Sequence, residues 1–230
     1  MPGAAGPADV RISVVIPALN EGATIAPAIA RLAGVLGDHE VIVVDGGSTD
    51  GTAVAVERAG AAVVAQPGSR AVAMNAGAAR AGGGALLFLH ADTTLPEGAG
   101  AAVRAALAER DGGAFTVAHD RRPLPFRFAA AAYRPFHHGV YGDQAIFVSR
   151  EAFDRVGGYA PLPIMEDYDF VQRLRREGRF EVLPLSVTTS ARRQRSQGEV
   201  RTLLRVGSIK LLYRLGVSPR WLAARYRPAR

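Results

Sequence analysis

Short apolar runs alternate with segments of helical periodicity along the first hundred residues. The apolar runs predict strands over 11–18, 40–45, 61–66 and 85–90. Apolar residues spaced three and four apart predict helices over 21–36, 52–60 and 69–81. Strands that alternate with helices indicate βαβ units and a parallel sheet. The expected fold class is therefore α/β, with a Rossmann-like, mostly parallel sheet flanked by helices.

The pattern of the second half is less regular. It predicts helices over 97–110, 151–158 and 165–178, strands over 112–119 and 144–150, and two short strands in "RFEVLP" and "SVTTSA". Residues 121–143 begin as a loop and become helical in pattern, and residues 197–215 are helical in pattern. With no internal repeat, the simplest division is a disordered lead (1–10), one domain (11–195) and a basic C-terminal helical extension (196–230).

Composition excludes several classes of site. The chain has 230 residues and no cysteine, which rules out disulfides, thiolate metal sites and cysteine nucleophiles. It has no apolar run of about 18 residues, so no membrane-spanning helix is expected. The first residues lack a basic region followed by an apolar one, so we expect no secretory signal and a cytoplasmic location.

Charge is unevenly distributed along the chain. Residues 1–100 hold five arginines against nine acids, whereas residues 192–230 hold ten arginines and Lys210 against Glu199 alone. A basic tail on a near-neutral body favours an anionic partner, and a merely solvated basic surface is the alternative. We expect helix 200–215 to pack on the domain through an apolar stripe that includes Leu211 and Leu215. For residues 218–230, with Trp221 and Tyr226 among arginines, we expect a peripheral contact with anionic lipid and no nucleic acid partner.

Polar residues gather where the predicted parallel strands end, which is the edge at which such sheets bind ligands. The four segments at this edge are Pro17 to Glu21, Asp45 to Asp50, Gln66 to Arg70, and His90 to Asp92. An aspartate such as Asp45 can accept hydrogen bonds from a nucleobase or ribose, although the turn "DGGSTDG" explains its presence equally well. Arg70 and Asn75, at the start of a helix, can hold phosphate or sugar hydroxyls.

Two acidic motifs suggest reactive chemistry. We expect His90 and Asp92 to share one face of a strand, because side chains repeat every two residues, and together they can hold a divalent cation with a diphosphate. In "EDYD", Glu166, Asp167 and Asp169 crowd a helix start, which suits the helix dipole. Crowding by like charges also raises the pKa of a carboxyl group and can make it a general base.

Four motifs in order resemble the family-2 glycosyltransferases of the GT-A fold. They are "ISVVIPALNEGATI", "VIVVDGGSTDGTAVAV", the strand end "HADT" and the late "ED" at 166–167, and the likeness runs from about Ile12 to about Ser190. Within the family, the chain is similar to a short, soluble bacterial subgroup whose members are often labelled as transferases of arsenosugar biosynthesis, on the segments "GSRAVAMNAGA", "LHADT", "GDQAIFVSREAFDRVGGY", "MEDYDF" and "TSARR".

The resemblance implies an activity and a set of site residues. The activity is metal-dependent, inverting, non-processive transfer of a sugar from a nucleoside diphosphate sugar, UDP favoured, to a hydroxyl of a small molecule or lipid. Asp92 would bind Mn²⁺ or Mg²⁺ on the donor diphosphate, Asp167 would be the base, and Glu166 its neighbour in the acceptor site. The donor-side residues would be Pro17, Asn20, Glu21, Asp45, His90 and Ala91, with Gly142, Asp143 and Gln144 near the donor sugar or acceptor. Arg192 and Arg193 are further candidates for phosphate contact, because guanidinium groups pair well with phosphate.

The chain departs from the family pattern at two places. His90 stands at the first position of the Asp-X-Asp motif, which weakens the expected metal affinity, and the side chain of Ala91 is expected to point into the fold. "ARRQRS" at 191–196 lacks the tryptophan of processive members. The alternatives are a nucleotidyltransferase and a non-catalytic, membrane-associated binding protein on the same fold. An NAD-binding dehydrogenase is disfavoured, since no Gly-X-Gly-X-X-Gly follows the first strand.

Overall fold

The computed structural model describes residues 10–119, 140–189 and 199–225, with side chains of the last segment described from residue 207. Its strands are β1 (Ile12–Ala18), β2 (His39–Asp45), β3 (Ala62–Ala65), β4 (Ala85–Phe88), β5 (Thr93–Thr94), β6 (Gly112–His119), β7 (Ile146–Ser149) and β8 (Phe180–Thr189). Its helices are α1 (Ile25–Leu36), α2 (Thr52–Arg58), α3 (Arg70–Arg80), α4 (Ala99–Leu107), α6 (Arg150–Arg155), α7 (Glu166–Glu177), α9 (Glu199–Arg214) and α10 (Pro219–Arg225), with a 3₁₀ turn, η3 (Gly142–Gln144).

The strands form a single mixed sheet with the order β3-β2-β1-β4-β7-β6-β8-β5. The strands β3, β2, β1 and β4 run parallel, as the alternating sequence pattern predicts. β7 is antiparallel to both of its neighbours, β4 and β6, while β6 and β8 are parallel to each other. Chain order reverses between β1 and β4, so a ligand crevice is expected just beyond the ends of these two strands.

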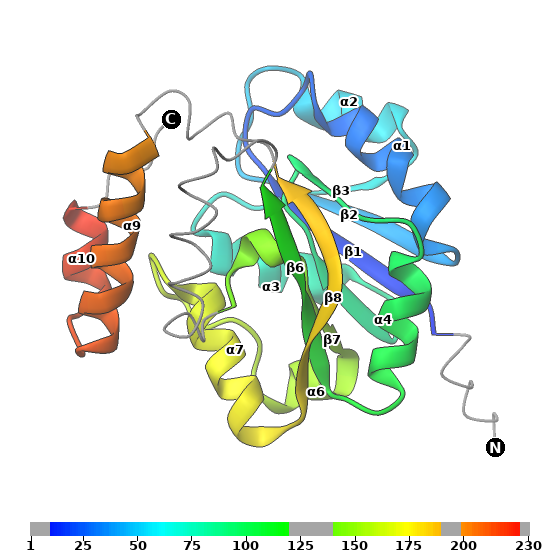
Figure 1. Ribbon diagram of the computed structural model, residues 1–230. Helices are drawn as coiled ribbons and strands as arrows, with labels where there is room; N and C mark the ends of the chain where they lie inside the picture. Colours follow the sequence, from blue (N-terminus) through cyan, green and yellow to red (C-terminus); the bar gives the residue numbers. More distant parts are fainter. Residues whose placement is uncertain (1–9, 120–139, 190–198, 226–230) are drawn as a thin grey trace.

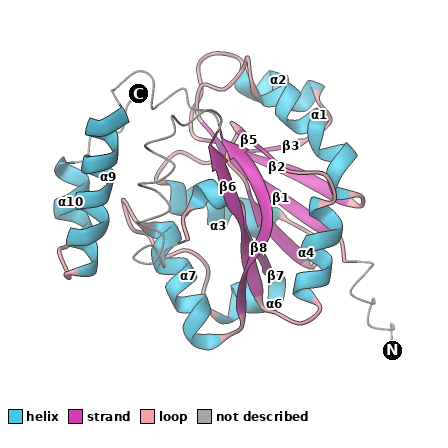
Figure 2. Ribbon diagram, in the orientation of Figure 1, coloured by secondary structure: helices cyan, strands magenta, loops and turns pink. Residues whose placement is uncertain are grey.

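Helices cover both faces of the sheet (Figures 1 and 2). On one face Ile12, Val14 and Ile16 of β1 pack in a cluster with residues of α1, α2 and α4. On the other face Val15 packs in a cluster with residues of α3, α6 and α7. Burial on both faces explains why β1 and β2 appear in the sequence as unbroken apolar runs. This two-sided core fixes the ends of β1, β2 and β4, and with them the loops that follow.

The last long strand differs from the sequence prediction. The segments "RFEVLP" and "SVTTSA" were expected as two strands, but β8 is continuous from Phe180 to Thr189. Its register against β6 shifts between Phe115, which pairs with Leu183, and Thr116, which pairs with Ser186. The strand therefore bulges at this point, where Pro184 has no N–H to donate to the ladder. The short strand β5 was not predicted, and α10 lies beyond the helical pattern of residues 197–215 but within the range expected as a C-terminal helical extension.

The helix α9, the first of the two helices of the C-terminal extension, packs on the domain through a face that the sequence pattern did not predict. Leu211 is 58% exposed and Leu215 is 71% exposed, so these two members of the expected apolar stripe do not pack on the domain. Instead, Lys210, Tyr213 and Arg214 contact aromatic rings of the domain. The prediction of a packed stripe is thus wrong for the part of α9 whose side chains are described.

Several sequence predictions fall on residues that the structure does not describe. They are the lead at 1–9, the segment 120–139, the phosphate candidates Arg192 and Arg193, and Tyr226.

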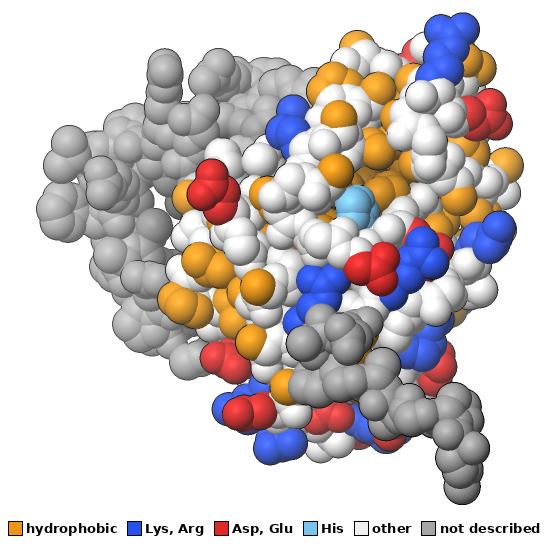
Figure 3. Space-filling model, turned by 90° about the vertical axis from the view of Figure 1, so that its right-hand side faces the viewer, with side chains coloured by type: hydrophobic (Ala, Val, Ile, Leu, Met, Phe, Trp, Pro, Cys, Tyr) orange, Lys and Arg blue, Asp and Glu red, His pale blue; other side chains and the backbone are white. Residues whose placement is uncertain are grey.

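Within the described ranges, every helix is too short or too polar to cross a membrane. On the face that Figure 3 shows, basic and acidic side chains are interspersed among the coloured residues, so no broad patch of one sign marks a partner there.

Candidate functional site

The loops after β1 and β2 interlock at the carboxyl edge of the sheet. The Asn20 N–H donates to Ser48 Oγ at 2.9 Å, and Asn20 Oδ1 accepts from the Thr49 N–H at 3.0 Å. Asp45, buried at the end of β2, accepts from the Ser48 N–H at 3.1 Å and from the Ser48 hydroxyl. The turn therefore uses the Asp45 carboxylate for its own closure, which is the structural explanation that the sequence left open.

The loop that contains Glu21 is tied to the start of α2. The Glu21 N–H donates to Thr52 Oγ1 at 2.9 Å, and the Gly22 N–H donates to Asp50 Oδ2 at 2.9 Å. Hydrogen bonds from Thr52 and Gly22 lower the pKa of the exposed Asp50 carboxyl. Pro17 lies within β1 opposite Val44, so the first two ligand-edge segments of the sequence meet as expected.

His90 and Asp92 lie in a turn rather than on one strand face. β4 ends at Phe88, and the Thr93 N–H donates to the carbonyl of His90 at 3.0 Å, which closes the turn. The two-residue alternation of side chains holds only in extended backbone, so the expectation of a shared strand face was wrong. Ala91 is buried in the core cluster, as expected, and Asp92 is half-buried at the ligand edge.

Glu166 and Asp167 form a buried acid pair in the first turn of α7. Each of these residues is only 7% exposed. Asp167 Oδ2 accepts the Gly142 N–H at 3.1 Å, whereas Asp167 Oδ1 is buried without a hydrogen-bond partner among the described residues. A buried carboxylate with one oxygen left over is uncommon in a folded protein and indicates a site for a further ligand or proton donor.

Among the residues that the structure describes, Arg70, at the start of α3, is the cation that pairs with these two acids. Its Nη1 lies 3.6 Å from Glu166 Oε1 and 3.6 Å from Asp167 Oδ2, and the side chain is 38% exposed. Burial, and then the charge of Glu166, raise the pKa of Asp167 to about 7, while Arg70 opposes the rise and Asp143 adds to it. A carboxyl group with a pKa near neutrality is suited to accept a proton.

Gly142 brings three sequence-predicted segments together. A Cβ placed on Gly142 would collide with Asp167 Oδ2 and would lie 2.9 Å from His90 Nε2. The backbone at Gly142 is thus in close contact with both the acid pair and the turn after β4. Any side chain at this position would separate them, so only glycine allows this approach.

Asn75 and Gln144 position other parts of the site. The Asn75 amide donates to the Tyr159 carbonyl at 2.8 Å and accepts from the Tyr159 N–H at 2.9 Å. Gln144 accepts from the Tyr141 N–H at 3.0 Å and donates to the Phe115 carbonyl at 3.1 Å. Their contacts with the protein indicate a positioning role, and direct contact with a donor or acceptor stays a prediction.

Left-handed backbone conformations support this location for the site. The non-glycine residues with positive φ among the described residues are Asn20 (54°), Ala145 (47°) and Met165 (65°). Asn20 follows β1, Ala145 follows η3, and Met165 directly precedes Glu166. Strained backbone is found preferentially at functional sites, where the surrounding structure holds it in place.

A group of tyrosines with one lysine, which the sequence pattern did not predict, lies beside the acid pair. The rings of Tyr141 and Tyr168 stack with centroids 5.8 Å apart, and Tyr213 of α9 meets Tyr168 edge-on at 5.7 Å. Lys210 Nζ lies 3.6 Å from the centroid of Tyr141. The only signal in the sequence was that Lys210 is the single lysine of the chain.

The described residues do not form a metal site by themselves. No three His, Asp or Glu side chains among them are grouped closely enough to hold a metal ion. Asp92 offers one half-buried carboxylate at the ligand edge. A cation held there would need oxygen ligands from a substrate, which is how Mg²⁺ is usually bound with phosphates.

Comparison with known proteins identifies a family. The family model described as Glycosyl transferase family 2 matches residues 13–160. No curated protein matches the chain. None of these findings distinguishes the arsenosugar subgroup, which stays a prediction.

Three solved structures are similar over most of the chain. A mannosyltransferase from Pyrobaculum calidifontis, in complex with GDP-Man and Mn²⁺, has 21% identity and a TM-score of 0.68, over 99% of this chain and 68% of that one. Residues 1–349 of TarS from S. aureus, with UDP-GlcNAc, have 19% identity and a TM-score of 0.62, over 78% of this chain and 58% of that one. Glucosyl-3-phosphoglycerate synthase from Mycobacterium tuberculosis, with Mn²⁺, UDP and glucosyl-3-phosphoglycerate, has 24% identity and a TM-score of 0.60, over 94% of this chain and 86% of that one. These likenesses establish the fold, which is the α/β class expected from the sequence.

Proposed function

The chain belongs to glycosyl transferase family 2 and is a glycosyltransferase, and we propose that it moves a sugar from a nucleoside diphosphate sugar to a hydroxyl with inversion at the anomeric carbon. The observation that carries the proposal is the buried Asp167 carboxyl, with a pKa of about 7, at the ligand edge of the sheet. The similar structures that hold GDP-Man, UDP-GlcNAc and UDP support the donor class.

Asp167 acts as the general base in this proposal. Its Oδ1 is buried and has no hydrogen-bond partner among the described residues, so it is available to accept the proton of an acceptor hydroxyl. The Gly142 N–H holds the other oxygen, Oδ2, and fixes the orientation of the carboxyl. Burial and the charge of Glu166 raise the pKa of Asp167, and Arg70 opposes the rise by stabilising the ionised form, so the pKa lies near neutrality.

Asp92 would hold a divalent cation together with the donor diphosphate. When bound, Mn²⁺ or Mg²⁺ offsets the negative charge that develops on the leaving diphosphate. The Mn²⁺ in two of the similar structures supports this assignment. The loops at Asn20 and Ser48, which are joined by two hydrogen bonds, would form the wall of the nucleoside pocket.

A thermal-shift panel tests the donor class. Binding to the folded state alone raises the melting temperature. UDP-, GDP- and dTDP-sugars are compared with and without Mn²⁺, and Mn²⁺ alone is the control. We expect one nucleotide series to stabilise the protein, and to do so more strongly with Mn²⁺. Stabilisation by none of the three would contradict the proposed donor class.

Replacing Arg70 by methionine should move the acid limb of the pH–rate profile to higher pH. Arg70 lowers the pKa of Asp167, so its loss raises that pKa, and the base then loses its proton only in more alkaline solution. The measurement is kcat against pH at saturating donor. Arg80→Met, at the exposed far end of the same helix, is the matched control. An acid limb that is unchanged in Arg70→Met would show that Arg70 does not act on the base.

We further propose that α10 makes a weak contact with anionic lipid. Trp221 is 45% exposed, and the guanidinium of Arg225 lies 3.6 Å from the centroid of its ring, while Leu215 is also exposed nearby in the sequence. Exposed apolar and basic side chains together suit a headgroup layer. Deletion of residues 218–230 should abolish binding to anionic vesicles.

Because that deletion also removes the buried Leu222, the double variant Arg220→Gln/Arg225→Gln is a milder test. A basic residue near an anionic surface contributes about 1 kcal/mol, so the double variant should bind roughly 30-fold more weakly. Liposome sedimentation at low and high salt, with neutral vesicles as control, measures the effect. Equal pelleting of all forms, or none at either salt, would leave α10 as ordinary surface.

A further inference from the structure

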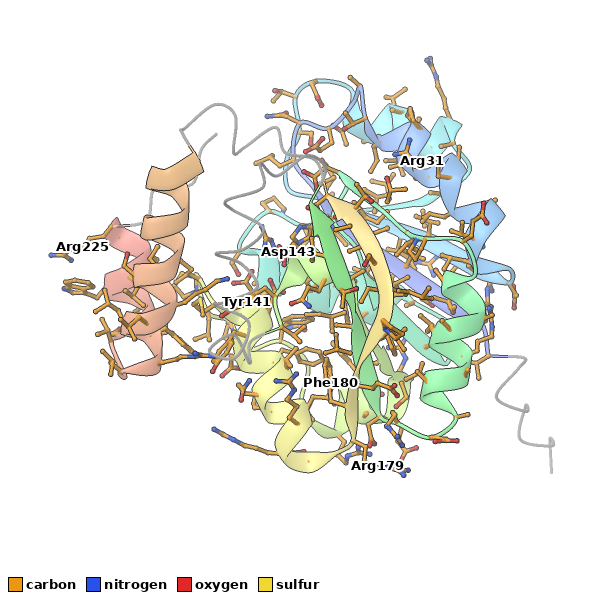
Figure 4. All side chains as sticks on the ribbon, in the orientation of Figure 1. Arg31, Tyr141, Asp143, Arg179, Phe180 and Arg225 are labelled. Carbon is orange, nitrogen blue, oxygen red and sulfur yellow. The ribbon has the colours of Figure 1, made fainter. Side chains whose placement is uncertain are left out.

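The single lysine of the chain lies at the edge of the candidate site. Of the 28 lysine and arginine residues, only residue 210 is a lysine. It lies on α9, and its Nζ is 3.6 Å from the centroid of the Tyr141 ring, a cation–π contact at short range. Figure 4 shows Tyr141 and Asp143 on the side of the domain that faces α9.

Tyr141 connects this lysine to the base. It directly precedes Gly142, whose N–H donates to Asp167 Oδ2, and its ring stacks on Tyr168, the residue that follows Asp167. Arg214, one helical turn after Lys210, places its guanidinium 5.7 Å from the Tyr168 ring. Two cations of α9 therefore lie on the aromatic side chains that flank the acid pair.

The charge of Lys210 is only partly compensated. Among the described side chains, no carboxylate lies within ion-pair distance of its Nζ, although Asp143 is close enough to favour its charged form. Burial lowers the pKa of Lys210 to about 8 in spite of Asp143. A partly buried cation without a paired anion is costly, and an anionic ligand would remove that cost.

We propose that Lys210 binds a carboxylate or phosphate group of the acceptor, so that the acceptor is an anionic hydroxy compound. This inference rests on the proposed function, because it takes Asp167 as the base for the acceptor hydroxyl. Lys210 contacts Tyr141, and the next residue, Gly142, is hydrogen-bonded to the proposed base Asp167. Lys210 is therefore connected to the base and not to the turn at Asp45, where the nucleoside is expected. This favours the acceptor over the donor as the source of the anion. An ammonium on a flexible stem suits a compact anion whose position varies slightly.

The single lysine allows a measurement on one side chain. Trace acylation at pH 8, followed by peptide mass mapping, reports the reactivity of Lys210, and the α-amino group of the chain is the internal control. Three probes share a three-carbon skeleton: glycerol, which is neutral, glycerate, which carries a carboxylate, and glycerol 3-phosphate. UDP and GDP with Mn²⁺ form the donor arm, and ionic strength is held constant with NaCl.

We expect glycerate or glycerol 3-phosphate to slow acylation of Lys210 several-fold, while glycerol and the nucleotides leave it unchanged. The reactivity of the α-amino group should not change with any probe. Equal reactivity of Lys210 under all conditions would overturn the proposal, and so would protection by nucleotides alone, which would place Lys210 at the donor diphosphate. If nucleotides stabilise the protein in the thermal-shift panel but no anion protects Lys210, this inference fails and the proposed function stands. Protection by anions without any nucleotide binding would instead contradict the proposed function.

Variants at Lys210 give a second test. With an anionic acceptor, Lys210→Gln should raise the acceptor KM by about 10- to 100-fold, the usual worth of a hydrogen bond to a charged group, and leave donor KM unchanged. Lys210→Arg should restore most of the acceptor affinity, since it keeps the charge. A donor KM that rises with the acceptor KM, or a Lys210→Arg variant no better than Lys210→Gln, would contradict acceptor binding by this charge.

Discussion

Replacement of Asp167 by asparagine is expected to lower the rate of sugar transfer by about 10²–10⁴-fold, the usual contribution of a general base. Asparagine has the same shape as aspartate, and its carbonyl oxygen can still accept the Gly142 N–H, so the site should keep its geometry. Asparagine has no carboxylate oxygen, however, and so it cannot take up the proton of the acceptor hydroxyl. Donor affinity should change little, because Asp167 faces Arg70 and Gly142 and not the Asn20 loop.

Asp169→Asn is the matched control for this variant. Asp169 lies in the same turn of α7, but its carboxylate is bound to Arg173 at 2.8 Å on the side of the helix that is more exposed. Its replacement should leave turnover within a few-fold of the wild-type rate. An Asp167→Asn variant that lost nucleotide binding and turnover equally would instead place Asp167 in the donor pocket.

Asp167→Asn should also stabilise the fold relative to the wild type, increasingly so as the pH rises toward 7 and above. The pKa of Asp167 is about 7 in the folded protein and near 3.8 in the unfolded chain, so the folded state holds a proton that the unfolded state has lost between these values. The free energy of unfolding of the wild type therefore falls as pH rises from about 4 to about 7. Asparagine does not ionise, so the melting temperature of the variant relative to wild type should increase across this range. If the difference in melting temperature between variant and wild type did not depend on pH, the pKa of Asp167 would not be raised in the folded protein.

Replacement of Asp92 by asparagine is expected to abolish both transfer and the Mn²⁺-dependent part of nucleotide binding. Asp92 is the carboxylate that the turn after β4 presents at the ligand edge, and an amide is a much weaker ligand for hard cations than a carboxylate. No other described side chains form a group that could replace it. The protein should stay folded, because Asp92 is half-buried and its turn is closed by backbone groups.

Calorimetric titration with the nucleoside diphosphate, with and without Mn²⁺, measures this effect. Glu97→Gln, an exposed acid a few residues later, is the control and should bind like the wild type. If Asp92→Asn turned over normally with Mn²⁺ present, the assignment of Asp92 to the metal would be wrong.

The parts of the site that the sequence predicted are those made by local pattern. Apolar runs ending in "PALNE" and "DGGSTDG" placed Asn20 and Asp45 at neighbouring strand ends, and the parallel pairing of β1 and β2 brings them together. The pairing of two central, buried strands follows from composition, because both are apolar on each face. The prediction failed for His90 and Asp92, since the strand ends two residues before His90 and side-chain alternation ends with it.

The contacts that give the site its character are not local. Gly142 and Asp167 are 25 residues apart, and their hydrogen bond depends on a 3₁₀ turn that has no periodic signature. The contact of Lys210 with Tyr141 depends on how α9 docks, and apolar periodicity pointed to the wrong face because the helix uses cation–π and aromatic contacts instead. Such contacts are set by tertiary packing, which a pattern along one chain does not encode.

The most direct test of the account is to follow the anomeric proton of an α-linked nucleoside diphosphate sugar by NMR while the enzyme turns it over with Mn²⁺, water serving as acceptor. Inverting transfer with Asp167 as the base predicts that nucleoside diphosphate and the β-anomer of the free sugar appear first, and that both appear about 10²–10⁴-fold more slowly with Asp167→Asn. Initial release of the α-anomer would contradict inversion. Formation of nucleoside monophosphate and sugar 1-phosphate would contradict sugar transfer altogether, because it would mean that the diphosphate and not the glycosidic bond is broken.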